Sequence, residues 1–360
     1  MRVDLVRPGD LDASQLGAWR RIQRDVRTFA GPFFSPEFTL ACAAVRSDVF
    51  IALISDGGAL AGFFPFQRGA LGVGQAVAGE RSNYQGVIVE PSAAWDARTL
   101  VRACRLRRWT FDHLVAAQEE FRPYWTRSAT SPLIELRDGF AAYAGQRKQN
   151  GSRLIPRVRE KERRLAREVG PVHFAPHVAD GVVLRQLMDW KSEQYVRTGE
   201  VDRFAVRWNV RLLETLHGTQ RGQEFAGVLA ALYAGEELAA AVFGLRAGEI
   251  FHWWFPTYAP SLARYSPGLI LLVKLAEHAN DMGVTTIDLG KDDADYKLRM
   301  ANGHVDLREG AVSANAVYGA VGRLRTLTRD AVLRSPLAGP ALRAVRHTRA
   351  LAERSDDPTR

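Results

Sequence analysis

Two segments in which strands alternate with tight glycine turns limit the folds open to this chain. In the first half, VFIALI and ALAGFFPF flank the turn SDGG, a pattern that predicts a β-hairpin. In the second half, strands over 225–233, 237–246 and 249–255 are joined by Ala-Gly-Glu and Ala-Gly turns. With helices before and after them, these hairpins predict an α+β fold built on mixed, mostly antiparallel sheets.

The elements around the hairpins recur in the same order in both halves. In the first half, further strands are predicted at 2–6, 82–89 (SNYQGVIV) and 110–115. Helices are predicted at 11–26 and 93–107, and a third is predicted to begin at Pro36, after the N-cap Ser35. The second half adds strands at 172–174 and 285–289, and helices at 182–197, at 210–216 and from Pro267. No residue-level repeat accompanies this order, so order alone predicts tandem domains. We expect an N-terminal domain at 1–140, a C-terminal domain at 141–312 and a basic helical tail at 313–360.

Positive charge is concentrated in one segment of the 360-residue chain, whose formal net charge is +9. Residues 147–167 hold nine Lys or Arg and two Glu, and they include a basic helix that starts at Ser152 or Pro156 and ends at Gly170. A solvated helix face is one interpretation. A patch that attracts an anionic nucleotide, a phosphorylated substrate or a membrane surface is the other. Nucleic acid is the less expected partner, because no helix-turn-helix or zinc-finger pattern is visible.

The remaining composition argues for a cytoplasmic protein. No apolar run reaches the length of a membrane span, and the N-terminus carries acids where a signal peptide needs an apolar core. The two cysteines, Cys42 and Cys104, predict buried thiols in a reducing compartment. The helical tail at 323–354 is expected to pack on the body, with contact to the inner membrane surface as the alternative.

The stretch RYSPGLILL has the features of an anion site at a helix start. Pro267 suits a first helical turn, and Gly268 lets a ligand approach the backbone without meeting a Cβ. We expect the amides of Leu269 and Ile270 to face a phosphate, with the guanidinium of Arg264 in front of them. A purely structural helix start remains the alternative.

This stretch, together with KSEQYVRTG and DLGKDDADYKLRMANG, resembles the GNAT superfamily of N-acyltransferases. More narrowly it is similar to the CelD-type acetyltransferases of cellulose and exopolysaccharide synthesis, which FFSPEF and SNYQGVIV also fit. The resemblance implies GNAT-like domains, acetyl-CoA or another acyl-CoA as co-substrate, and transfer of the acyl group to an amine or hydroxyl. The expected acceptor is a small molecule or a saccharide of an envelope polysaccharide, and a polysaccharide synthesis complex at the inner membrane is an expected partner. The CoA pyrophosphate would then lie against residues 264–270, here Arg264, Tyr265, Ser266, Gly268, Leu269 and Ile270.

The resemblance also suggests catalytic residues. Tyr296 matches the tyrosine that protonates the departing thiolate, with a packed core tyrosine as the alternative. His252 is the first candidate for the base and Asp288 the second, although a strand histidine and a turn aspartate are common structural residues. Asp292 is a further candidate base.

Expected acceptor-binding residues follow from the same motifs: Lys191, Tyr195, Asp292, Lys297 and Arg299. The YKLR segment also resembles Fem-type peptidyltransferases, in which the two cations would face phosphates of the acceptor. No metal is expected, because the aspartates at 292–295 lack a second ligand cluster. Three functions stay open: an acyl-CoA-dependent transferase, a Fem-type aminoacyl-tRNA-dependent transferase, and a non-catalytic partner of a polysaccharide synthesis complex.

Overall fold

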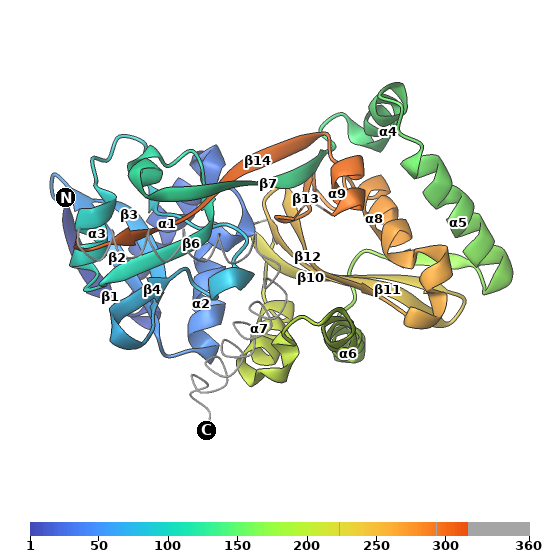
Figure 1. Cartoon of the computed structure of the whole chain (residues 1–360), viewed down its shortest axis with the longest axis horizontal. Coiled ribbons are helices and arrows are strands. Elements are labelled where there is room, and N and C mark those ends of the chain that lie inside the picture. Colours follow the sequence, from blue (N-terminus) through green and yellow to red (C-terminus); the bar gives the residue numbers. More distant parts are fainter. Residues whose placement is uncertain (223, 293, 316–360) are drawn as a thin grey trace, which may run out of the picture.

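The computed structural model describes residues 1–222, 224–292 and 294–315, which form two lobes joined by one continuous sheet (Figure 1). Within these residues the sheet has 14 strands, in the order β1-β2-β3-β4-β6-β14-β7-β13-β12-β11-β10-β8, with β5 beside β3 and β9 beside β10. Only the β4–β6 and β12–β13 strand pairs are parallel. The predicted fold class, α+β with a mixed and mostly antiparallel sheet, is confirmed.

The strands are β1 (Arg2–Val6), β2 (Val49–Asp56), β3 (Ala59–Arg68), β4 (Val73–Gln75), β5 (Ile88–Val89), β6 (Arg108–Val115), β7 (Trp125–Glu135), β8 (Val172–Ala175), β9 (Gln220–Arg221), β10 (Phe225–Ala234), β11 (Glu237–Ala247), β12 (Ile250–Tyr258), β13 (Thr286–Asp288) and β14 (Gly303–Ser313). The α-helices are α1 (Ala13–Asp25), α2 (Pro36–Val45), α3 (Ala97–Ala103), α4 (Gly139–Gln149), α5 (Leu154–Glu168), α6 (Gly181–Thr198), α7 (Arg207–His217), α8 (Pro267–Glu277) and α9 (Asp295–Met300).

Two predicted elements of the first half are wrong in extent. Only β5 forms in the segment 82–89, because the Gln85 side chain holds the preceding loop against β6 by donating to Asp112 Oδ1 at 2.7 Å. The helix predicted at 93–107 is α3 alone. It starts late because the Asp96 side chain caps it, accepting from the Thr99 amide at 2.7 Å, and the chain turns left-handed at Arg105 (φ 54°). The predicted tail lies outside the described residues, apart from its first three positions.

The last strands of the two halves cross between the lobes. β14 lies between β6 and β7, with Leu307 opposite Val115 of the first half. Conversely, β7 extends out of the first half to pair with β13, where Leu133 is opposite Asp288. Figure 1 shows both strands running along the top of the molecule from one lobe to the other. Each lobe therefore contains a strand that completes the sheet of the other, and the expected boundary at residue 140 remains a prediction.

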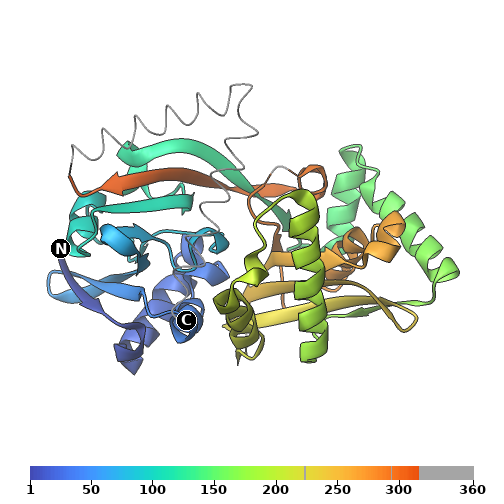
Figure 2. The same ribbon diagram turned by 60° about the horizontal axis from the view of Figure 1, so that its bottom comes forward.

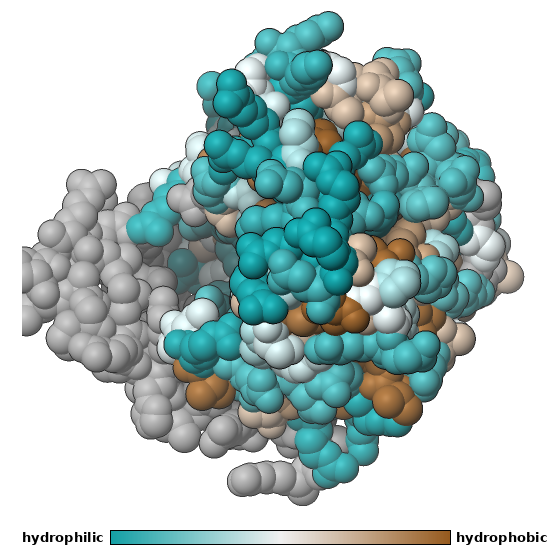
Figure 3. Space-filling model, turned by 90° about the vertical axis from the view of Figure 1, so that its right-hand side faces the viewer, coloured by the Kyte–Doolittle hydropathy of each residue, from teal (hydrophilic) through white to brown (hydrophobic). Residues whose placement is uncertain are grey.

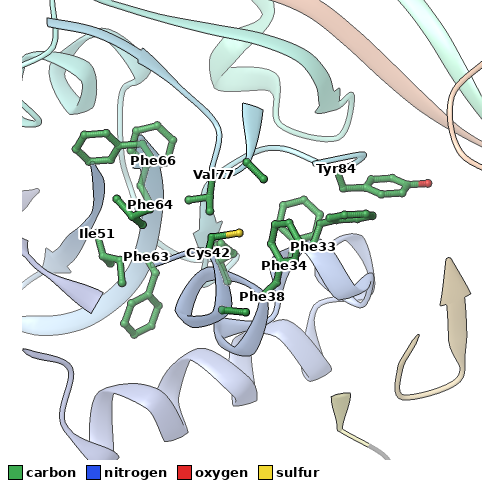
Figure 4. Packing of buried hydrophobic residues seen from close by; sticks show 14 of the residues in the cluster. Phe33, Phe34, Phe38, Cys42, Ile51, Phe63, Phe64, Phe66, Val77 and Tyr84 are labelled. Carbon is green, nitrogen blue, oxygen red and sulfur yellow. The ribbon is translucent and has the colours of Figure 1, made fainter. Parts of the chain in front are cut away.

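Aromatic side chains fill the core of the N-terminal lobe. α2 packs its apolar face onto the β2–β3 hairpin, with Phe38 and Phe63 fully buried (Figure 4). Cys42 lies within this cluster and Cys104 nearby, and both are buried free thiols, as predicted. At the edge of the cluster, Tyr84 points its hydroxyl away from the apolar side chains (Figure 4). That hydroxyl belongs to the polar site described below.

The C-terminal lobe places helices on both faces of β10–β12. α8 covers one face with a wholly apolar set that includes Ile270 and Leu271, and α5 lies along its outer side. α6 crosses the opposite face (Figure 2). In the described part of the chain, no helix is both long and apolar enough to cross a membrane.

Candidate functional site

Strands β12 and β13 separate after three paired residues. Ile250 to His252 pair with Thr286 to Asp288, and β12 then continues to Tyr258 paired only with β11. A β-bulge assists this separation, because Gly244 of β11 faces both Trp253 and Trp254 on β12. A Cβ on Gly244 would lie 2.6 Å from the His252 carbonyl oxygen, so this close approach requires glycine. Beyond residue 252, β12 has a strand partner on one side only.

A buried polar network lies where the two strands separate. Ser131 Oγ donates to Asp288 Oδ1 at 2.6 Å, and the Gly290 amide donates to the same oxygen at 2.9 Å. His252 Nδ1 lies 3.5 Å from Asp288 Oδ1, and its Nε2 lies 2.7 Å from the Asn83 side-chain nitrogen. Burial alone would raise the pKa of Asp288, but His252 and the Ser131 hydroxyl outweigh it and hold that pKa below its usual value.

This network draws on both lobes and excludes solvent. His252 is fully buried and Asp288 is 3% exposed, with the Phe33 ring edge-on to the imidazole at 4.8 Å between ring centroids. Burial, followed by the charge of Asp288, raises the pKa of the Tyr84 hydroxyl well above its usual value. His252 and Asp288, which the sequence offered as alternative bases, therefore lie next to each other in one network. His252 has no contact with solvent and Asp288 has very little, so a catalytic role for them remains a prediction.

Lysine side chains from two helices lie beside the part of β12 that has no partner on the β13 side. Lys191 of α6 donates to the Pro256 carbonyl at 3.1 Å and lies 5.4 Å from the centre of the Tyr195 ring. Lys297 of α9 is 7% exposed and donates to Asp292 Oδ2 at 2.6 Å and to the Gly290 carbonyl at 3.2 Å. Four residues expected to bind the acceptor thus belong to one group, although they come from segments about 100 positions apart.

The surroundings of Lys191 lower its pKa. Burial is the main cause that lowers the pKa of Lys191, from 10.5 to about 8, and the cations Arg203 and Lys297 lower it further. Glu200 and Asp292 offset part of the effect. A lysine with such a pKa is partly neutral near pH 8 and can accept a proton there.

Tyr296 lies on α9 and packs against the apolar side chains of the α8 face. Burial, and then the charge of Asp292, raises the pKa of its hydroxyl to about 12. The hydroxyl consequently stays protonated at neutral pH and can donate a hydrogen bond or a proton.

The start of α8 differs from the prediction in its details. The Leu269 and Ile270 amides both donate to the Ser266 carbonyl, at 3.0 and 3.2 Å, so the expectation that they are free for a phosphate is wrong. The side chains of Tyr265 and Ile270 are fully buried and cannot line a ligand site. The Leu269 and Ile270 amides are hydrogen-bonded within the helix because the carbonyl of the N-cap residue, Ser266, closes the first helical turn.

The rest of this loop retains the features of an anion site. Ser266 is left-handed (φ 53°), and its hydroxyl accepts from Lys161 of α5 at 2.6 Å. A Cβ on Gly268 would meet only Tyr258, at 3.6 Å, so the glycine leaves the helix start accessible. Arg264 is exposed and bonded to Tyr265 and Glu168. Lys161 is a cation that the sequence pattern did not assign to this loop.

Arg299 is separate from the other expected acceptor residues. Its guanidinium pairs with Asp295 at 3.1 Å, and its carbonyl accepts from Arg147 of α4. Lys297 and Arg299 are two positions apart on a helix, so their side chains leave it in different directions. The prediction that both face the same ligand does not fit this arrangement.

Sequence patterns missed three members of the polar network: Asn83, Tyr84 and Ser131. They belong to the first half and meet His252 or Asp288 only through the tertiary fold. The signal available was the polar SNYQG stretch, which interrupts an otherwise apolar segment. For metals, the described residues contain no group of three His, Cys, Asp or Glu side chains able to hold an ion.

Comparisons with known proteins agree with this geometry. Residues 152–298 match the family model of the acetyltransferase (GNAT) domain. FemX has a similar structure, with a TM-score of 0.58 and 9% identity, over 89% of this chain and 100% of FemX. The C-terminal domain of a protein assigned as a lysylphosphatidylglycerol synthetase from Agrobacterium fabrum gives a TM-score of 0.50 and 12% identity, over 89% of this chain and 98% of that domain.

A conserved protein of unknown function from Bacteroides thetaiotaomicron gives a TM-score of 0.51 and 11% identity, over 87% of this chain and all of that chain. No curated protein matches the sequence. At these identities the structural neighbours establish the fold alone. The family match begins just before α5, ends within α9 and includes the separated strands and the α8 loop, so this part of the chain is similar to GNAT acetyltransferase domains.

Proposed function

We propose that this protein transfers an acyl group from acyl-CoA to an amine or hydroxyl of a sugar or of an envelope-polysaccharide precursor. The observation that carries the proposal is the separation of β12 from β13 beside the cationic group of Lys191 and Lys297. Backbone of β12 that has no partner on the β13 side lies there beside titratable side chains, as acyl transfer requires. The proposed reaction takes place in the cytoplasm, with peripheral attachment to the inner membrane as part of the proposal.

The start of α8 would hold the pyrophosphate of CoA. Arg264, Lys161 and the Gly268 backbone provide two cations and an approach free of a Cβ. Bound there, acetyl-CoA supplies an activated thioester. Backbone N–H groups of β12 beyond His252, which have no strand partner on the β13 side, are suited to stabilise the negative charge that develops on its carbonyl oxygen.

Two side chains beside the separated strands are suited to move protons. Lys191, with its lowered pKa, can accept the proton of the acceptor's amine or hydroxyl. Tyr296, which stays protonated, can donate to the departing sulfur. In this proposal His252 and Asp288 position the end of β12 and do not contact substrate.

The acceptor would bind beside Lys297 and Tyr195. Lys297 already bonds Asp292, so the pair offers both a donor and an acceptor to hydroxyl-bearing or phosphorylated groups. The aromatic face of Tyr195, next to two cations, suits the apolar face of a sugar ring.

Acetyl-CoA binding tests the proposal directly. We expect wild-type protein to bind acetyl-CoA in isothermal titration calorimetry and the G268V variant to lose that binding, because the valine blocks the start of α8. We expect G268V to fold normally, since a Cβ at this position makes only an ordinary van der Waals contact with Tyr258. G145V is the matched control: Gly145 lies on α4, a Cβ there meets nothing within 4 Å, and its binding should equal that of wild type.

Equal binding by G268V and wild type would place CoA elsewhere and refute this donor site. If acetyl-CoA binds as expected, thiol release in the presence of candidate amino sugars and polysaccharide precursors would identify the acceptor.

A transferase that uses aminoacyl-tRNA is the second candidate, and one observation favours it. Arginines at the start of α5 and along it, such as Arg153, Arg157 and Arg163, are exposed on one side of the C-terminal lobe and could contact nucleic acid. Thermal stabilisation by tRNA and not by acetyl-CoA would favour this function. Stabilisation by neither would favour the non-catalytic partner of a synthesis complex.

A further inference from the structure

Four arginines surround an open pocket of about 350 Å³ between α4, α5 and α9. Its lining includes Arg147, Arg153, Arg157 and Arg299, together with Asn150 and Ser152. No aspartate or glutamate is part of this lining. Figure 3 shows that the side of the molecule carrying these helices is largely hydrophilic.

Most of this charge is not neutralised within the described residues. Arg299 has one exposed carboxylate partner, Asp295, whereas Arg147 donates to the carbonyl of Arg299. The Nε atom of Arg147 is buried and lacks a hydrogen-bond partner in the described structure. Arg153 and Arg157 are exposed at the start of α5, whose first turn contains no acid. Like charges held this close repel one another, and an anion among them would remove that cost.

The pocket is distinct from the start of α8. α5 lies beside α8 in the opposite direction: Lys161 bonds Ser266 at the beginning of α8, whereas Arg159 bonds Glu277 at its end. The first residues of α5 consequently lie beyond the end of α8, away from the loop proposed to hold CoA.

A second pocket of about 400 Å³ adjoins the first and shares Arg147 and Asn150 with it. Its other polar lining includes Gln146, Asn302 and Thr130. A ligand with an anionic head group and a polar body would place the head group in the four-arginine pocket and the body in the adjoining one.

We infer that the four-arginine pocket binds a phosphoryl or pyrophosphoryl group of a ligand whose polar body extends into the adjoining pocket. Guanidinium groups match phosphate oxygens in pairs, and the first turn of α5 adds the favourable end of its dipole. The helix start is not the basis of the inference, which rests on the arginines and on the unpartnered Nε of Arg147. The inference is independent of the acyl-transfer proposal.

Inorganic pyrophosphate is the probe for this site. We expect the wild-type chain to bind pyrophosphate in isothermal titration calorimetry at low salt, and the R153Q/R157Q variant to bind it about tenfold more weakly, or about 1.4 kcal/mol. R163Q/R167Q is the matched control: it removes the same charge from exposed positions near the other end of α5 and should leave the affinity unchanged. Acetyl-CoA affinity should be equal in all three proteins, so failure of this site and failure of the donor site can be told apart.

A lipid headgroup can present the same phosphoryl chemistry. Co-sedimentation with phosphatidylglycerol vesicles that depends on Arg153 and Arg157 would support the site and identify its source as a membrane lipid. The inference is overturned if R153Q/R157Q retains wild-type binding of pyrophosphate and of vesicles. It is equally overturned if both double variants lose the same affinity, because the attraction would then belong to α5 as a whole.

Discussion

Replacing Lys191 with methionine should stabilise the protein at neutral pH while abolishing its proposed activity. Folding lowers the pKa of this lysine from 10.5 to about 8, mainly by burial, so the charged form is disfavoured in the folded state. At about 1.36 kcal/mol per pKa unit, the penalty at pH 7 is about 3.4 kcal/mol. K191M removes that penalty but loses the hydrogen bonds to Gln194 and Pro256, each worth about 1 kcal/mol. The expected net gain at pH 7 is therefore about 1 kcal/mol in the free energy of unfolding.

The difference in stability between K191M and wild type should depend on pH. Between about pH 8 and pH 10.5 the unfolded chain binds more protons at Lys191 than the folded chain, so the wild-type protein gains stability as the pH rises. By pH 9.5 about 2 kcal/mol of the penalty is gone, and K191M should be equal to wild type or slightly less stable. The advantage of the variant should thus disappear on going from pH 7 to pH 9.5.

Urea unfolding followed by tryptophan fluorescence at the two pH values measures this difference. K148M, at an exposed lysine of α4, is the control and should show no pH-dependent difference from wild type. If K191M differs in stability from wild type by the same amount at both pH values, the pKa of Lys191 is not lowered by folding. Its role as proton acceptor must then be abandoned.

Three further substitutions probe the site. Y296F removes one hydroxyl and little packing, so turnover should fall by about 10²-fold with acetyl-CoA affinity unchanged in calorimetry; wild-type turnover would rule out an acid at this position. K297A should raise the KM for the acceptor much more than it lowers kcat in steady-state assays, and the reverse pattern would count against acceptor binding. S131A removes the 2.6 Å hydrogen bond to buried Asp288 and should cost about 1–3 kcal/mol in urea unfolding, whereas no loss would mean that the network adds little stability.

Local signals predicted most of the elements because they depend on neighbours in the sequence. The SDGG turn places glycines at left-handed positions, Gly57 and Gly58, and the hairpin of β2 and β3 follows from them. Pro36 likewise marks the first residue of α2. The segment 82–89 was misjudged because its backbone pairs with β6 only in an isolated bridge at Gln85, whose side chain also bonds Asp112.

The site was only partly predictable, for a geometric reason. Lys191, Tyr195, Asp292 and Lys297 were singled out on their motifs, and the structure brings them together. The contacts of Asn83 with His252 and of Ser131 with Asp288 depend on pairings between the two halves, which no local pattern encodes. Grouping Arg299 with Lys297 could have been avoided, because residues two apart on a helix point in different directions.

The crossing of β7 and β14 has a consequence for how the chain folds as it is synthesised. β6 pairs with β14 at Val115 and Leu307, positions about 190 residues apart in the chain. At about 5–20 residues per second of translation, the β6 edge waits roughly 10–40 s for its partner after it has been made. Until then an apolar strand has an open edge, where strands of other chains can pair and start aggregation. A ribosome-bound chain that stops before residue 303 should therefore depend on chaperones to stay soluble, and extension through residue 313 should relieve that dependence.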